Sequence, residues 1–123
     1  MISVPSFLLK RIYVTGSLRN TVGGFEFQLN NVLGSGYAYR MAPLNLDGVE
    51  LPVNSTFFIV DDEETAFSDV SKNNPFTLAM NKTIVVWVDG VSLKLGPHKL
   101  VVCFDVSGFG TLQFDVTDVV SDD

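Results

Sequence analysis

Apolar and polar side chains alternate along residues 24–30. The apolar members are Phe25, Phe27 and Leu29, and the polar members are Glu26, Gln28 and Asn30. Successive side chains of a β-strand point to opposite faces, so a period of two predicts a strand with one dry and one wet face. A helix is disfavoured here, because its apolar positions recur every three or four residues.

Similar alternation recurs at short intervals along the chain. Strands are expected at residues 10–15, 37–41, 44–46, 49–51, 55–60, 76–80, 83–88, 98–106 and 111–119. The Asp-Gly pair at residues 47–48 favours a tight hairpin turn, because both residues tolerate positive φ. The run 83–88 is apolar on both faces, which is typical of a central strand. Only residues 61–75 lack strand periodicity, and we expect one or two helical turns within 65–72.

These short strands, separated by turn signals, predict an all-β fold. We expect an antiparallel β-sandwich of about seven to nine short strands, and a closed barrel stays the alternative. A chain of 123 residues is long enough for one compact domain. We therefore take residues 1–123 as a single β-sandwich domain.

Charge and cysteine content narrow the class of protein. A net charge of −6 disfavours nucleic-acid binding, and no apolar run approaches the roughly 18 residues of a membrane span. The single cysteine, Cys103, cannot form an internal disulfide and is expected as a buried thiol, which points to a reducing compartment, the cytoplasm. Acidic residues are expected in a solvated loop at 61–64 and in a polar tail comprising Asp118, Asp122 and Asp123.

Candidate catalytic groups are few. His98 is the only histidine, and it follows Gly96-Pro97 at the start of a strand, where a structural role is the commoner one. One histidine, one cysteine and scattered carboxylates make a poor transition-metal site. No nucleophile elbow and no phosphate-binding glycine loop is found. We expect no catalytic, cofactor-binding or metal-binding residue in this chain.

Four side chains are expected to serve an interface or to shape a site: Arg19, Tyr37, Tyr39 and Arg40. The tyrosines follow a glycine-rich, loop-like segment. Each arginine lies beside aromatic residues rather than within a run of charges. Arginine pairs bidentately with carboxylates and stacks on rings, which suits interfaces. An ordinary surface position is the alternative for each arginine.

Three segments, taken in order, carry a family resemblance. They are residues 17–20 (Ser-Leu-Arg-Asn) with 24–27 (Gly-Phe-Glu-Phe), residues 39–44 (Tyr-Arg-Met-Ala-Pro-Leu), and residues 90–98 (Gly-Val-Ser-Leu-Lys-Leu-Gly-Pro-His). Together they resemble the small β subunit of C-glycoside deglycosidases. Residues 61–80 have little that matches this family.

The resemblance implies a non-catalytic small subunit of a sugar-processing lyase complex, which cleaves the carbon–carbon bond between a 3-oxo sugar and its aglycone. It further implies a larger TIM-barrel α subunit as partner. That subunit would hold a divalent metal and the catalytic base, so this chain would need no cofactor. Two alternatives stay open. One is a self-associating β-sandwich with a binding or structural role, forming a homo-oligomer without an enzymatic partner. The other is a small independent enzyme that uses His98.

Overall fold

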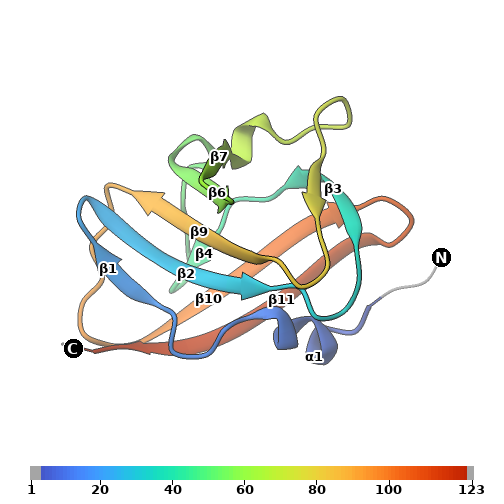
Figure 1. The fold of residues 1–123 in the computed structure, drawn as a ribbon. Helices are drawn as coiled ribbons and strands as arrows, with labels where there is room; N and C mark the ends of the chain where they lie inside the picture. The colour runs from blue at the N-terminus through green and yellow to red at the C-terminus, as the bar shows by residue number, and fades with distance from the viewer. Residues whose placement is uncertain (1–3, 122–123) are drawn as a thin grey trace.

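The computed structural model describes residues 4–121, and strands dominate it (Figure 1). The strands are β1 (Arg19–Thr21), β2 (Gly24–Asn30), β3 (Gly36–Met41), β4 (Asn45–Leu46), β5 (Val49–Glu50), β6 (Thr56–Val60), β7 (Glu63–Ala66), β8 (Phe76–Leu78), β9 (Thr83–Asp89), β10 (Gly96–Val106) and β11 (Gly110–Val120). The helices are α1 (Ser6–Leu9) and the 3₁₀ turns η1 (Lys10–Ile12), η2 (Val53–Ser55) and η3 (Phe67–Asp69). Within the described residues, no helix is long and apolar enough to cross a membrane.

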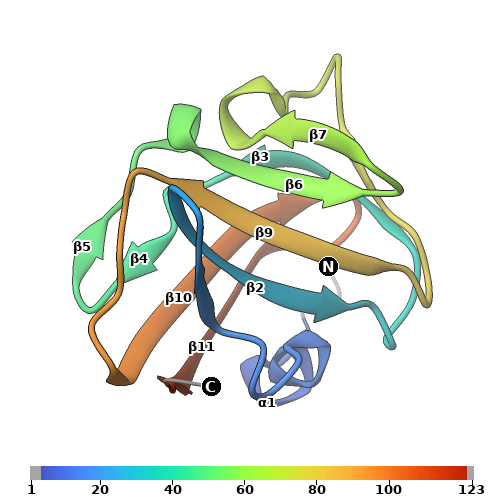
Figure 2. The same cartoon turned by 60° about the vertical axis from the view of Figure 1, so that its left-hand side comes forward.

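The strands form two antiparallel sheets that lie one over the other (Figures 1 and 2). The first sheet has the order β1-β2-β9-β6-β7. In the second, β10 pairs with β11 along its whole length on one edge and with β4 and β3 in succession on the other, and β5 and β8 lie outside these two. The predicted antiparallel β-sandwich is confirmed. Eleven strands are found in residues 4–121, more than the seven to nine expected.

The core lies between the two sheets, where the inward faces of their strands meet. The first sheet contributes Phe25, Phe27, Leu29, Phe58, Ile84, Val86 and Val88, and the second contributes Leu100, Val102, Phe104, Leu112 and Phe114. The buried face predicted for residues 24–30 is therefore confirmed. The central position predicted for residues 83–88 is also confirmed, since β9 lies between β2 and β6.

Two hairpin turns consist of residues with positive φ. At the predicted Asp-Gly turn between β4 and β5, Asp47 has a φ of 52° and Gly48 a φ of 89°. Between β6 and β7, Asp61 and Asp62 have φ values of 51° and 67°. Aspartate tolerates this region better than most residues, because its short side chain bonds locally. The second turn was not anticipated, since an Asp-Asp pair is a weaker turn signal than Asp-Gly.

The strand predicted for residues 10–15 is wrong. Residues 6–12 form α1 followed by η1, and only Tyr13 makes an isolated bridge, to Leu29. Leu9, Ile12 and Tyr13 stand at helical spacing, and all three pack on the core. The same residues also carry the strand-like alternation of Ile12 and Val14, so two patterns compete. Packing against β11 favours the helix. Figure 2 shows α1 beside β11.

Residues 61–75 hold more regular structure than predicted. Glu63–Ala66 forms strand β7, paired with β6, and only η3 within residues 65–72 is helical. Strand β7 lacks an alternating pattern because it is a short edge strand with exposed glutamates. Charged residues on edge strands discourage pairing with other chains. The expected exposure of residues 61–64 is confirmed.

Candidate functional site

An apolar cavity of about 160 Å³ lies between the two sheets. Side chains of β2, β6 and β9 line it from the first sheet, and side chains of β3, β8, β10 and β11 line it from the second. Leu9 and Ile12 line it from the N-terminal helical segment, and Phe109 from the turn between β10 and β11. Its walls are therefore assembled from segments far apart in the sequence.

The cavity opens at the loop between β2 and β3, which we call the mouth loop (residues 31–35). Leu33, Gly34 and Ser35 line the cavity and are also exposed. The buried Asn31 side chain organises this loop. Its Nδ2 donates to the carbonyls of Gly34 (2.6 Å) and Leu78 (3.0 Å). Its Oδ1 accepts from the backbone N–H groups of Leu33 and Gly34, both at 3.2 Å.

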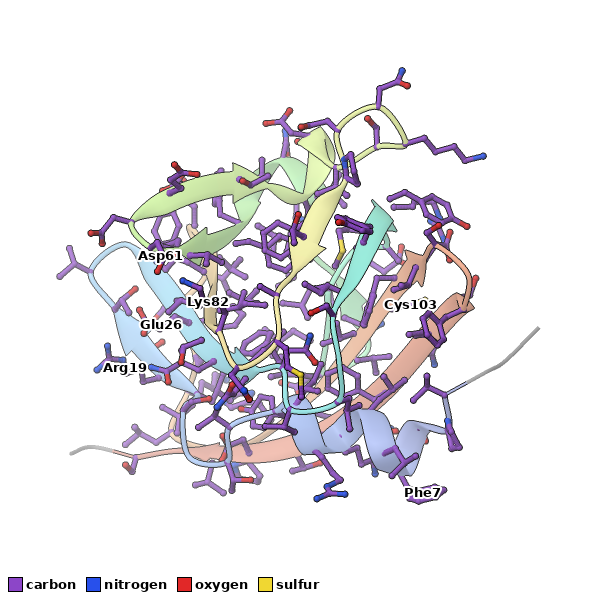
Figure 3. All side chains as sticks on the ribbon, turned by 45° about the vertical axis from the view of Figure 1, so that its right-hand side comes forward. Phe7, Arg19, Glu26, Asp61, Lys82 and Cys103 are labelled. Atoms are coloured by element: carbon purple, nitrogen blue, oxygen red, sulfur yellow. The ribbon has the colours of Figure 1, made fainter. Side chains whose placement is uncertain are left out.

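The mouth loop is also bonded to the turn that precedes β9. The Met80 N–H donates to Ser35 Oγ (3.3 Å), and the Asn81 N–H donates to the Asn31 carbonyl (2.8 Å). These two segments expose three large apolar side chains, which we call the loop rim: Val32, Leu33 and Met80, with 43%, 39% and 51% of their surfaces exposed. Phe7 is likewise exposed, on the outer side of α1 (Figure 3).

Asp118 is a buried carboxylate on the inward face of β11. Its Oδ2 accepts the Tyr13 hydroxyl (2.6 Å) and the N–H groups of Gly16 (2.9 Å) and Leu18 (3.3 Å). Burial raises the pKa of Asp118, but these bonds and one from the Val119 N–H outweigh it, so the pKa lies below its usual value. The polar tail predicted for Asp118 is wrong, because the residue is 6% exposed and clamps residues 13–18 to β11. Residues 122–123 of that predicted tail lie outside the described residues.

A second carboxylate, Asp105, lies on β10 and has two hydrogen-bond partners. It accepts from the Thr111 hydroxyl (2.5 Å) and from Nε of Arg40 (2.6 Å). These two groups hold the pKa of Asp105 below its usual value. Burial raises the pKa of the nearby Cys103 thiol, which keeps the thiol neutral. Cys103 is only half-buried, so the prediction of a buried thiol is wrong.

His98 joins the start of β10 to the β4–β5 turn. Its Nδ1 lies 2.6 Å from Oδ2 of Asp47, and its Nε2 lies 2.7 Å from the Lys94 carbonyl oxygen. Both neighbours are acceptors, so both ring nitrogens donate when the ring is charged. Accordingly, the Lys94 carbonyl and the Asp47 carboxylate raise the pKa of His98. Both nitrogens thus have partners within the chain.

The four residues expected at an interface fall into two places. Arg19 lies on β1 and donates through Nη2 (3.1 Å) and Nε (3.2 Å) to Glu26 (Figure 3). Tyr37, Tyr39 and Arg40 lie together on β3, in the other sheet. The Lys72 ammonium sits 5.6 Å from the centre of the Tyr39 ring. An interface role for these residues stays a prediction.

Sequence reasoning missed the residues that shape the cavity. Asn31 lies in a segment rich in Asn, Gly and Ser, and such a composition predicts only a loop. Its bond to Leu78 joins residues distant in sequence, which no local pattern reveals. Among the described residues, no group of three or more His, Cys, Asp or Glu side chains is placed to hold a metal ion.

A protein-family model described as "Hydroxymethylglutaryl-CoA reductase, N-terminal domain" matches residues 8–121 of the chain. The match begins within α1 and includes every strand of both sheets. No curated protein matches the chain.

This match overturns the resemblance to the small subunit of C-glycoside deglycosidases. The predicted lyase complex, its carbohydrate chemistry and its TIM-barrel α subunit are therefore wrong. The alternative of a self-associating binding or structural protein is not supported either. The resemblance depended on short motifs, and two of them fall at turns, where Gly, Asn, Ser and Pro recur for conformational reasons in unrelated proteins.

Proposed function

Because the chain belongs to the family of the hydroxymethylglutaryl-CoA reductase N-terminal domain, we propose that it acts as an accessory domain of such a reductase. In this role it packs against the catalytic part and leaves the reduction to that part. The observation that carries the proposal is the extent of the family match, which spans both sheets of the sandwich.

The hydrogen bonding of the ionisable groups supports an accessory role. Catalytic acids and bases usually combine a perturbed pKa with access to a substrate. Here the carboxylates with perturbed pKa values, Asp47, Asp105 and Asp118, each hold parts of the fold together. His98, whose pKa is also perturbed, likewise has both ring nitrogens hydrogen-bonded to groups of the domain. These groups stabilise the domain rather than face a reactant.

The charge of the chain argues against a role in holding the substrate. Coenzyme A carries phosphate groups, and proteins hold phosphates with arginine, lysine or free backbone N–H groups. The chain has a net charge of −6. Three of its cations, Arg19, Arg40 and Lys82, are paired with carboxylates of the same domain. The catalytic part is therefore the better place for the thioester.

The loop rim is the surface that we assign to contact with the catalytic part. Val32, Leu33 and Met80 stand on two segments that are hydrogen-bonded to each other, so they form a supported apolar surface. Apolar side chains grouped in this way mark interaction sites more often than single exposed ones do. The family also indicates which partner would cover this surface, because it is described as the N-terminal domain of an enzyme. A domain of this kind would pack against the remainder of that enzyme. We further place the protein in the cytoplasm, which its single free cysteine favours.

The proposal is tested with the purified chain and the catalytic polypeptide of the reductase from the same source. The chain alone should not consume hydroxymethylglutaryl-CoA, and it should bind the catalytic polypeptide in calorimetry. The double variant Leu33→Asp/Met80→Asp should bind at least tenfold more weakly. The matched control is Val22→Asp, which places a charge at a fully exposed apolar position in the β1–β2 turn and should leave binding unchanged.

Two results would overturn this function. One is turnover of hydroxymethylglutaryl-CoA by the isolated chain. The other is a failure of the folded chain to bind the catalytic polypeptide at tens of micromolar. Equal weakening by Val22→Asp and by the double variant would reject the loop rim as the contact and leave the accessory role in place.

A further inference from the structure

We propose that the cavity between the sheets is a binding site for one small apolar molecule, of the size of a six-membered ring or a short alkyl chain. The inference does not depend on the proposed function, because it follows from the volume and lining of the cavity. At about 160 Å³, the cavity is close in volume to engineered protein cavities of about 150 Å³ that take up benzene.

The lining selects an apolar occupant. Asn31 and Ser35 are the only polar side chains among the residues that line the cavity. The Asn31 amide uses both of its N–H donors and accepts twice through its oxygen, all within the mouth loop and β8. Ser35 Oγ accepts the Met80 N–H. The Ser35 hydroxyl hydrogen is then the one side-chain donor left in the lining, so a charged or strongly polar ligand would lose most of its hydration without replacement, which is unfavourable.

The same lining disfavours water as the occupant. A buried water makes about three hydrogen bonds to polar groups that lack partners. Phe27, Val86, Val102 and Phe104 offer none, Asn31 is already bonded, and Ser35 offers only its hydroxyl hydrogen, which is fewer than the three bonds that a buried water makes. An unfilled cavity in turn loses dispersion contacts along its walls, because protein interiors are otherwise close-packed. An apolar molecule restores these contacts and brings no unpaired polar group.

The substrate of the matched family is excluded as the occupant. A hydroxymethylglutaryl group carries a hydroxyl and a carboxylate, and the cavity lining offers no cation and only one side-chain donor, the Ser35 hydroxyl. The mouth loop supplies the entry, since its exposed Leu33, Gly34 and Ser35 border the cavity. Its ties to the rest of the fold are Asn31 and Ser35, which bond it to β8 and to the turn before β9.

The test is titration of the full chain with benzene and, separately, with cyclohexane. Binding is followed by methyl NMR of the valine, leucine and isoleucine side chains and by the melting temperature. We expect saturable shifts at Ile84, Val86 and Val102, together with a rise in melting temperature at saturation. Hydroxymethylglutarate at the same concentration should shift none of these signals.

Variants at adjacent positions of β10 separate the cavity from the outer surface. Val102 lines the cavity, whereas Val101 is half-buried and points away from it. Val102→Phe should weaken benzene binding at least tenfold by filling the cavity, and Val101→Phe should leave the dissociation constant within twofold. If Val102→Phe does not fold, Val102→Leu gives a smaller weakening in the same direction. The proposal is rejected if neither hydrocarbon gives saturable shifts up to its solubility, or if the folded Val102 variant binds as tightly as the wild type does.

Discussion

Asp118→Ala tests how the N-terminal segment is held on the sandwich. Asp118 is the only side chain described that accepts hydrogen bonds from Tyr13, Gly16 and Leu18 together, and these residues lie 100 or more positions away in sequence. The substitution removes the acceptor of these three donors at once, together with that of the Val119 N–H, which belongs to an exposed residue. Residues 13–18 lead from the helical segment into β1, so their release should loosen one side of the fold.

The magnitude follows from which donors are buried. Tyr13 and Leu18 are buried, whereas Gly16 is exposed and its N–H regains water. A buried donor that loses its acceptor costs about 1–3 kcal/mol. The Tyr13 bond is short (2.6 Å) and the Leu18 bond is long (3.3 Å), so we assign them about 2 and about 1 kcal/mol. A total of about 3 kcal/mol is a large share of a typical unfolding free energy and lowers the melting temperature by roughly 10 °C.

The assay is urea denaturation at pH 7 of the wild type, Asp118→Ala, Tyr13→Phe and the double variant. Tyr13→Phe removes the strongest of the bonds and should cost about 2 kcal/mol. Because both single variants break the same bond, the double variant should cost about 3 kcal/mol rather than the sum of about 5. Asp115→Ala, on the same strand but not hydrogen-bonded to this segment, is the matched control and should stay within about 0.5 kcal/mol of the wild type.

Acid should reduce the effect. The pKa of Asp118 is lowered in the folded protein, so the charged form stabilises the fold at pH values above the unfolded pKa of 3.8. The stability difference between wild type and Asp118→Ala should therefore be constant near neutral pH and should shrink as the pH falls below about 4. The reasoning is refuted if Asp118→Ala costs less than about 1 kcal/mol at pH 7, or if its effects add fully with those of Tyr13→Phe.

Two further predictions concern β10 and β2. His98→Gln should be less stable than the wild type below about pH 6.5, and the difference should fade as the pH rises through the raised pKa of folded His98, because the folded state holds that proton more tightly. Urea denaturation across this pH range measures it, and a difference that does not change with pH would contradict the assignment. Gly24→Ala should cost about 3 kcal/mol in the same assay, because its Cβ would lie 1.9 Å from the Val88 carbonyl oxygen and the backbone would have to shift. Gly36→Ala is the control, since its Cβ meets a Val106 methyl at 3.2 Å, and a loss as large as that of Gly24→Ala would count against the steric argument.

Much of the fold was predictable because it depends on neighbours in sequence. The alternation in β2, β10 and β11 reports which side chains face the core, and the structure buries those faces. The Asp47-Gly48 pair predicts its turn from backbone preferences alone. Such signals are local, so they can be interpreted without knowing which strand is the partner.

The errors arose where two local patterns competed or where the local signal was weak. Residues 10–15 carry both a strand-like alternation and the helical spacing of Leu9, Ile12 and Tyr13, and packing on β11 selected the helix. Asp118 looked like part of an acidic tail, yet its position on the inward face of β11 buries it. The candidate site was not predictable, because the cavity is enclosed by side chains from both sheets and by the mouth loop.

The sequence by itself determined an all-β fold of short antiparallel strands, because the alternating side chains of β2, β10 and β11 show which face of each strand is buried. Only the tertiary structure decided that Asp118 holds residues 13–18, that Asn31 ties the mouth loop to β8, and that a cavity remains between the sheets. The physical reason is that hydrogen bonds between distant residues, and the space left between two packed surfaces, depend on how the sheets are placed against each other. That placement follows from all the strands together and is encoded in no single stretch of the chain.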